Sequence, residues 1–132
     1  MLDAVTVSQA VARDWRELYE AFWQPTDFPR WAAGLSGTLE QAGETWRAVG
    51  LGGPVTIRFS PHNPYGVMDH WVEIATGAVV YVPLRILANR DGALVQLTLF
   101  RQPEMDDAAF AGDRALVEVD LTTLKSLAES GR

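Results

Sequence analysis

The stretch MDDAAFAGDRALVEVDLTTLKSLAES, residues 105–130, closes the sequence and predicts one long helix. Asp106 is a suitable N-cap residue, and Asp107 suits the positive end of a helix dipole. Helical spacing places a stripe of apolar residues on one face, formed by Phe110, Val117, Leu121, Leu124 and Ala128. A helix of this length with one apolar face needs a broad apolar surface as its partner.

The preceding region, residues 36–101, predicts that partner surface. Its apolar residues recur with a period of two, which is typical of strands. Clusters of Gly, Pro, Asn and Asp interrupt the pattern at hairpin spacing, so neighbouring strands are expected to pair antiparallel. The predicted strands lie near residues 38–42, 45–49, 55–60, 67–74, 79–88 and 93–100.

The N-terminal region adds one strand and two helices. Residues 3–9 alternate apolar and polar side chains, residues 14–23 have the periodicity of an amphipathic helix that Asp14 caps, and residues 26–35 predict a second, short helix. The chain is therefore expected to be a single α+β domain over residues 1–132. A curved antiparallel sheet of seven strands, wrapped around the long C-terminal helix, would satisfy every element. Because a curved sheet and a straight helix diverge, a cavity is expected between them.

The composition excludes several classes of function. The net charge is −6 and no basic stripe is visible, which argues against binding nucleic acid or anionic lipid. The sequence has no cysteine, so disulfides, thiolate metal sites and cysteine nucleophiles are excluded. It has two histidines without metal-binding spacing, so no metal or other cofactor is expected.

Targeting signals and phosphate-binding loops are also not evident. The N-terminus does not resemble a signal peptide, and no apolar run reaches the roughly 20 residues of a membrane-spanning helix. A cytoplasmic protein without membrane insertion is therefore expected. The glycine-rich stretch GLGG, residues 50–53, opens no helix and has no lysine after it, so we interpret it as a rim loop rather than a phosphate site.

Several segments together resemble a known family. They are FPRWAAGL (28–35), GVMDHWV (66–72), VYVPLRIL (80–87), LTLFRQPEM (97–105) and DRALVEVDLTTLKSLAE (113–129). In this order and spacing they resemble the START-like superfamily, also called SRPBCC, and its small bacterial polyketide cyclase/dehydrase-like members. The resemblance implies a helix-grip fold whose cavity takes small hydrophobic ligands such as lipids, sterols or polyketides. It does not imply an activity, because members of one fold family differ widely in function.

Hairpin geometry predicts which side chains face the cavity. A turn at residues 89–92 places Ala88 opposite Ala93 and Leu84 opposite Leu97, so these aliphatic residues share one face. We expect that face to point inward. Arg85 then points toward water.

The loop PHNPYG, residues 61–66, predicts the next pairing. It places His70 opposite Ile57 on the apolar face and Asp69 opposite Arg58 on the other face, where they would form an ion pair. Asp69 and His70 are neighbours in a strand and so point to opposite faces. They are therefore not expected to act as a catalytic dyad.

The turn after residue 74 leaves two alternatives. A three-residue loop at 76–78 places His70 opposite Leu84 and points it into the cavity. A two-residue loop places His70 opposite Pro83, on the face of Arg85. We favour the three-residue loop, because the apolar residues then share one face. The predicted ligand-binding residues are His70, Ile57, Phe59, Met68, Val72, Val82, Leu84, Leu97, Leu99, Val117 and Leu121.

His70 is the polar member of this apolar set and has three interpretations. It is a core or pocket-lining histidine, a group that hydrogen-bonds the ligand, or a general acid or base. Arg85 and Asp69 are the other catalytic candidates. Arg85 either pairs with Glu73 or Asp69 on the outer face, or binds an anionic ligand if the strand faces are reversed.

Three functions remain open from the sequence. The first is the binding of a small hydrophobic or aromatic ligand in the cavity. The second is an enzyme similar to polyketide cyclases, dehydratases or isomerases, with His70 as acid or base. The third is a protein-interaction module. Assembly as a homodimer is also left open.

Overall fold

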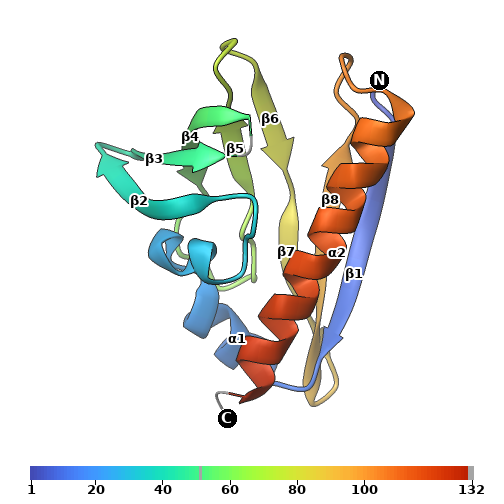
Figure 1. Ribbon diagram of the computed structural model, residues 1–132. Helices are drawn as coiled ribbons and strands as arrows, with labels where there is room; N and C mark the ends of the chain where they lie inside the picture. Colours follow the sequence, from blue (N-terminus) through green and yellow to red (C-terminus); the bar gives the residue numbers. More distant parts are fainter. Residues whose placement is uncertain (51, 131–132) are drawn as a thin grey trace.

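A computed structural model describes residues 1–50 and 52–130, so that one position of the predicted GLGG loop lies outside the described residues. The elements are β1 (Ala4–Val11), α1 (Trp15–Phe22), the 3₁₀ helix η1 (Pro25–Arg30), β2 (Ser36–Ala42), β3 (Thr45–Gly50), β4 (Gly53–Phe59), β5 (His70–Glu73), β6 (Val79–Val82), β7 (Leu84–Asn89), β8 (Gly92–Phe100) and α2 (Asp107–Ser130). The structure confirms the α+β class and the long closing helix (Figure 1).

The strands form two antiparallel sheets rather than the single seven-stranded sheet that we expected. The sheets have the strand orders β1-β8-β7 and β2-β3-β4-β5-β6. The predicted strand 79–88 is divided into β6 and β7 at Pro83. Proline has no backbone N–H and cannot continue a hydrogen-bonded ladder on that side, which explains the break.

Hydrogen bonds join the two sheets across this break. The carbonyl of Pro83 accepts from Thr98 N at 3.0 Å, and the carbonyl of Leu84 accepts from Met68 N at 2.8 Å. The amide of Leu84 has a side-chain partner instead of a backbone one, because it donates to Asp69 Oδ1 at 3.0 Å. The predicted strand 67–74 is therefore also divided. Its first residues pair with β7, whereas β5 pairs with β6. We call this junction, formed by Asp69, Pro83 and Leu84, the seam.

The β7–β8 hairpin has the predicted register. Ala88 lies opposite Ala93 and Leu84 opposite Leu97. The β4–β5 hairpin differs from the prediction by two residues, since His70 pairs with Phe59 rather than Ile57. Its loop is longer than the six residues expected.

The β5–β6 turn also differs from both predicted alternatives. It is a three-residue turn at 75–77, closed by Ile74 N donating to Ala78 O at 3.0 Å, and His70 lies opposite Val82. Gly77 takes the left-handed conformation there, with φ of 87°. Shifts of two residues keep every side chain on its predicted face, because the strand repeat is two. His70 therefore points inward, as the three-residue alternative predicted.

Helix α2 lies across the concave side of the sheets and beside β1 (Figure 1). Its residues Leu121, Leu124 and Ala128 are fully buried in the core, as the apolar stripe predicted. Asp106 caps the helix by accepting from Ala109 N at 2.8 Å, also as predicted. None of the described helices is both long and apolar enough to cross a membrane.

The two N-terminal helical segments close one end of the core. Asp14 Oδ2 accepts from the amides of Arg16 and Glu17 at 3.1 and 3.2 Å, which confirms its predicted role as the cap of α1. The predicted second helix at 26–35 is only the six-residue 3₁₀ helix η1. Pro29 lies inside this segment and lacks the N–H that an α-helix would need there.

Candidate functional site

His70 lies at the start of β5 and points into the interior, where 4% of its surface is exposed. The ring of Phe28, from η1, packs edge to face against it with centroids 4.9 Å apart. The ring of Phe59, from the neighbouring strand β4, lies 5.7 Å away. The only polar side chain that we predicted on this wall is therefore enclosed by aromatic rings.

The contacts of His70 fix its tautomer. Nδ1 lies 3.2 Å from the carbonyl oxygen of Met68, which can only accept, so Nδ1 carries the proton. Burial lowers the pKa of His70 to about 4, although the contact with Met68 and the charge of Asp69 act to raise it. The ring is neutral near pH 7 on this basis, and Nε2 is a hydrogen-bond acceptor that has no partner among the described residues.

A buried donor without a partner lies in the same aromatic cluster. Trp31 is 2% exposed, and its Nε1 is the single fully buried polar atom among the described side chains that lacks a hydrogen bond. Phe28 packs against Trp31 at 4.8 Å and against His70 at 4.9 Å between ring centroids. The unpaired donor of Trp31 and the imidazole of His70 therefore both lie against one phenylalanine.

The other predicted wall residues also lie on the inner face, but they differ in exposure. Five are buried in the core, namely Ile57, Met68, Leu84, Leu97 and Leu121. Five are only half-buried, namely Phe59, Val72, Val82, Leu99 and Val117. Beside Phe59 and Met68 lies a pocket of about 10 Å³, which has room for one water molecule.

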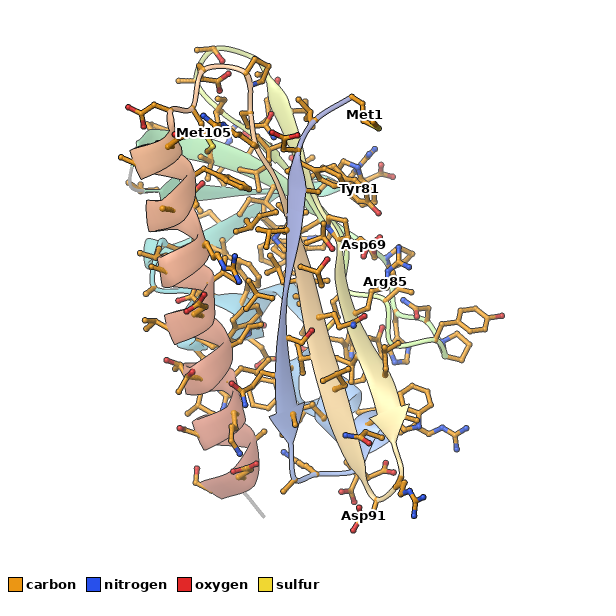
Figure 2. The ribbon with its side chains drawn as sticks, turned by 90° about the vertical axis from the view of Figure 1, so that its right-hand side faces the viewer. Met1, Asp69, Tyr81, Arg85, Asp91 and Met105 are labelled. Atoms are coloured by element: carbon orange, nitrogen blue, oxygen red, sulfur yellow. The ribbon has the colours of Figure 1, made fainter. Side chains whose placement is uncertain are left out.

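Asp69 lies on the opposite face of the sheet from His70 and is itself buried at the seam. Its carboxylate accepts hydrogen bonds from Leu84 N, from Tyr81 Oη at 2.6 Å, and from Arg85 Nε and Nη2 at 3.0 and 2.9 Å. Burial would raise the pKa of Asp69, but these hydrogen bonds outweigh it and lower the pKa. Figure 2 shows Asp69, Tyr81 and Arg85 together on the side away from α2.

The predicted ion pair between Asp69 and Arg58 is wrong. The shift of two residues in the β4–β5 hairpin places Arg58 opposite Trp71, and its guanidinium lies 4.8 Å from the centre of that ring. The ring of Tyr81, on the neighbouring strand β6, stacks against the ring of Trp71 with centroids 5.3 Å apart. The outer face therefore carries a cross-strand stack of a cation and aromatic rings, which stabilises the sheet.

Arg85 lies on the outer face opposite Gln96, as the outward alternative predicted. Its side chain is 48% exposed and forms a two-pronged ion pair with Asp69. The hydrogen bonds that Arg85 donates to Asp69 raise the pKa of Arg85 further. The alternative that Arg85 binds an anionic ligand inside the cavity is wrong, because its strand face is the outer one.

Residues that the sequence did not mark complete the site. Phe28 lies in η1 and Trp31 directly follows it, both more than 35 positions before His70, and no local pattern could have joined them to it. Asp120 was also missed, because it lies beside the apolar stripe of α2. It is 8% exposed and accepts from Ala33 N at 3.0 Å. Burial raises the pKa of Asp120, although the bond from Ala33 acts to lower it.

His62 belongs to a separate surface cluster. Its ring is half-exposed, lies 2.7 Å from Glu20 Oε1, and packs against Tyr19 and Trp23. Within the described part of the chain, no group of three or more His, Asp or Glu side chains could hold a metal ion. Neither histidine therefore takes part in a metal site of that kind.

Comparisons by sequence give no relatives. No known protein-family profile matches the chain, and no curated protein is detectably similar to it in sequence.

Comparisons by structure give clear likenesses. A START superfamily protein from Mycobacterium smegmatis is 13% identical and has a TM-score of 0.71, with 98% of this chain and 99% of that chain covered. The Aha1 dimer from Colwellia psychrerythraea is 16% identical, with a TM-score of 0.74 and 99% of both chains covered. DynU16, a protein of the dynemicin biosynthetic locus, is 19% identical with a TM-score of 0.73, and the match covers 98% of this chain and 48% of DynU16.

The chain therefore has the helix-grip fold of the START-like superfamily, as its segments predicted. At these identities the likeness establishes the fold alone.

Proposed function

We propose that this protein binds a small apolar or aromatic molecule between the curved sheets and α2, and that His70 accepts a hydrogen bond from it. The observation that supports this most is the neutral imidazole of a residue that is only 4% exposed, for whose Nε2 no hydrogen bond is found among the described residues. Nε2 is not one of the fully buried unpaired atoms, so water can reach it in the free protein, and a ligand group would replace that water. A hydroxyl or amide group of a ligand would satisfy this acceptor.

The half-buried part of the inner face supports an apolar ligand. Val72, Val82, Leu99 and Val117 come from β5, β6, β8 and α2, and all retain exposed surface. A ligand that covers them gains about 25 cal/mol for each Å² of apolar surface removed from water. The unpaired Trp31 Nε1 offers a second polar contact, as a donor. The occurrence of DynU16 in a biosynthetic locus is in keeping with a small-molecule ligand.

The pKa of His70 favours a binding role over a catalytic one. A general base works best when its pKa is near the working pH, and the pKa of about 4 makes His70 a weak base near pH 7. Asp69, the other candidate for assisting His70, is held on the opposite face by Arg85. We also propose a cytoplasmic location, which the lack of cysteine in the sequence supports.

The test compares β-naphthol with its methyl ether by titration calorimetry. The two probes have the same apolar rings, but only the naphthol donates a hydrogen bond. The wild-type protein should bind the naphthol more tightly by roughly two- to tenfold, the value of one hydrogen bond of about 0.5–1.5 kcal/mol. His70→Phe should abolish this preference while leaving the binding of the ether.

The control is His62→Phe, which removes the other histidine from the surface cluster and should keep the preference. An equal preference in the wild type and in His70→Phe would contradict the role of His70. If the wild type bound neither probe, and native mass spectrometry of freshly purified protein found no retained small molecule, the binding function itself would be refuted.

A further inference from the structure

Strand β1 ends the three-stranded sheet, and none of the described strands lies beside its outer edge. It pairs with β8 through eight consecutive residues, Ala4–Val11, without a register shift. Its sequence, AVTVSQAV, contains no charged residue and no proline. Figure 2 views the molecule onto this edge, and β1 is the strand nearest to the viewer.

The hydrogen bonds show which groups are free. In an antiparallel pair, alternate residues point their backbone groups toward the partner strand. Asp3 O accepts from Arg101 N at 2.8 Å, so the odd-numbered residues bond to β8. The even-numbered residues then present their N–H and C=O groups to the free edge. They are Ala4, Thr6, Ser8 and Ala10.

Little covers these groups. Ala10 O accepts only from the side chain of its neighbour Gln9 at 3.1 Å, and Glu129 closes one end of the edge by accepting from Ala12 N at 2.8 Å. Beside the edge, a hollow of about 370 Å³ is lined by residues 6–9 of β1 and by α2 residues that include Arg114 and Glu118. The edge is therefore open to a further strand.

The opposite end of the fold is protected, and β1 is not. Edge strand β2 has a register shift between Ser36 and Glu40, and it carries the charge of Glu40. Irregularity and charge are common devices that prevent an edge strand from pairing with another chain. A regular, uncharged edge such as β1 has the features of a pairing surface.

We propose that β1 pairs antiparallel with β1 of a second copy of this chain, about a two-fold axis at Val7. A two-fold axis at Val7 pairs the most residues, because Val7 lies midway between Ala4 and Ala10, the first and last residues whose backbone groups face the free edge. Thr6 then faces Ser8 of the second copy, and Ala4 faces Ala10 of the second copy. The side chains along this edge are small, so two strands can approach at the usual spacing of about 4.8 Å.

The charges beside the edge fit the same two-fold symmetry. α2 carries Arg114 and Glu118 next to the centre of β1, and the two residues now pair with each other at 3.2 Å, both about half-exposed. A two-fold axis at Val7 sets the two α2 helices antiparallel on the same side of the joined sheet. Arg114 of one copy then approaches Glu118 of the other, so the charges attract rather than repel.

Amide hydrogen exchange, followed by NMR at increasing protein concentration, tests the pairing. The amides of Val5 and Val7 lie in the β1–β8 ladder and should be protected at every concentration. The amides of Thr6 and Ser8 should exchange as free amides at micromolar concentration and become protected at millimolar concentration. Sedimentation should show a monomer–dimer equilibrium over the same range.

A proline at position 8 gives the decisive variant. Ser8→Pro removes an N–H that is not part of the β1–β8 ladder, so it should weaken the dimer by about tenfold or more while the fold persists. Ser8→Ala keeps the N–H and should dimerise as the wild type does. A monomer at all concentrations, or a dimer that Ser8→Pro does not weaken, would overturn the proposal. Protection of Thr6 and Ser8 only on adding a partner's extended peptide would overturn the choice of a second copy.

Discussion

The buried imidazole of His70 makes the stability of this protein depend on pH in a way that one substitution should remove. The perturbation is His70→Phe, which keeps an aromatic ring between Phe28 and Phe59 and takes away the group that titrates. Phenylalanine also needs no hydrogen-bond partner in this apolar setting. His70→Gln is a second variant that cannot titrate and is smaller.

The magnitude follows from the pKa of His70 in the two states. The unfolded chain binds a proton near the ordinary pKa of 6.5, whereas the folded chain binds it only near a pKa of about 4. Because the unfolded state holds more protons between these values, stability is complete above the upper one and falls as the pH is lowered. The loss reaches roughly 3 kcal/mol at and below the lower pKa.

The assay is guanidinium denaturation of the wild type and of both variants at a series of pH values. Carboxylates titrate in all three proteins, so the difference in unfolding free energy isolates the contribution of His70. Relative to the wild type, each variant should gain about 3 kcal/mol between about pH 7 and about pH 4. In the wild type, the ring carbon resonances of His70 should not titrate near pH 6.5.

Two results would refute this reasoning. Parallel curves of stability against pH for the wild type and the variants would mean that the pKa of His70 is the same in both states. A ring resonance that titrates near its ordinary pKa would show that burial does not lower the pKa of the imidazole. His62→Phe serves as the control, because it leaves the environment of His70 intact.

Two further substitutions probe carboxylates that hold segments together. Asp69→Asn keeps the shape of the side chain at the seam but loses the ion pair with Arg85. It should lower the free energy of unfolding by about 2 kcal/mol, a modest loss because Arg85 is half-exposed and solvent screens the pair. Chemical denaturation at neutral pH measures this, and an unchanged stability would contradict it. Asp120→Asn should stabilise the protein at neutral pH, since the amide still accepts from Ala33 N without a buried charge. That gain should shrink as the pH falls through the raised pKa of Asp120, and a gain that did not depend on pH would rule out this explanation.

The two proposals concern different parts of the molecule and can fail separately. Ligand binding depends on the inner face around His70, whereas pairing of copies depends on the outer edge of β1. Val7 is buried on the inner face and also marks the proposed two-fold axis, so dimerisation would place two binding sites on one joined sheet. A monomeric protein could still bind the naphthol probe, and a dimer could form without any ligand.

The sequence by itself determined the features that depend on local repeats. The helical stripe of Leu121 and Leu124 predicted α2 and its buried face, and the turn at 89–92 predicted the β7–β8 register. The inward direction of His70 was also predictable. A strand alternates every two residues, so the observed shifts of two could not change its face.

Only the tertiary structure decided what surrounds these residues. Register between strands depends on how many residues each loop uses, and the loop before β5 uses more than its composition suggested. Because of that difference, Asp69 lies at the seam beside Arg85 and not opposite Arg58. The seam forms where Pro83, which lacks a backbone N–H, interrupts the sheet between β6 and β7. Phe28 and Trp31 reach His70 through packing between distant segments, which no repeat in the sequence records.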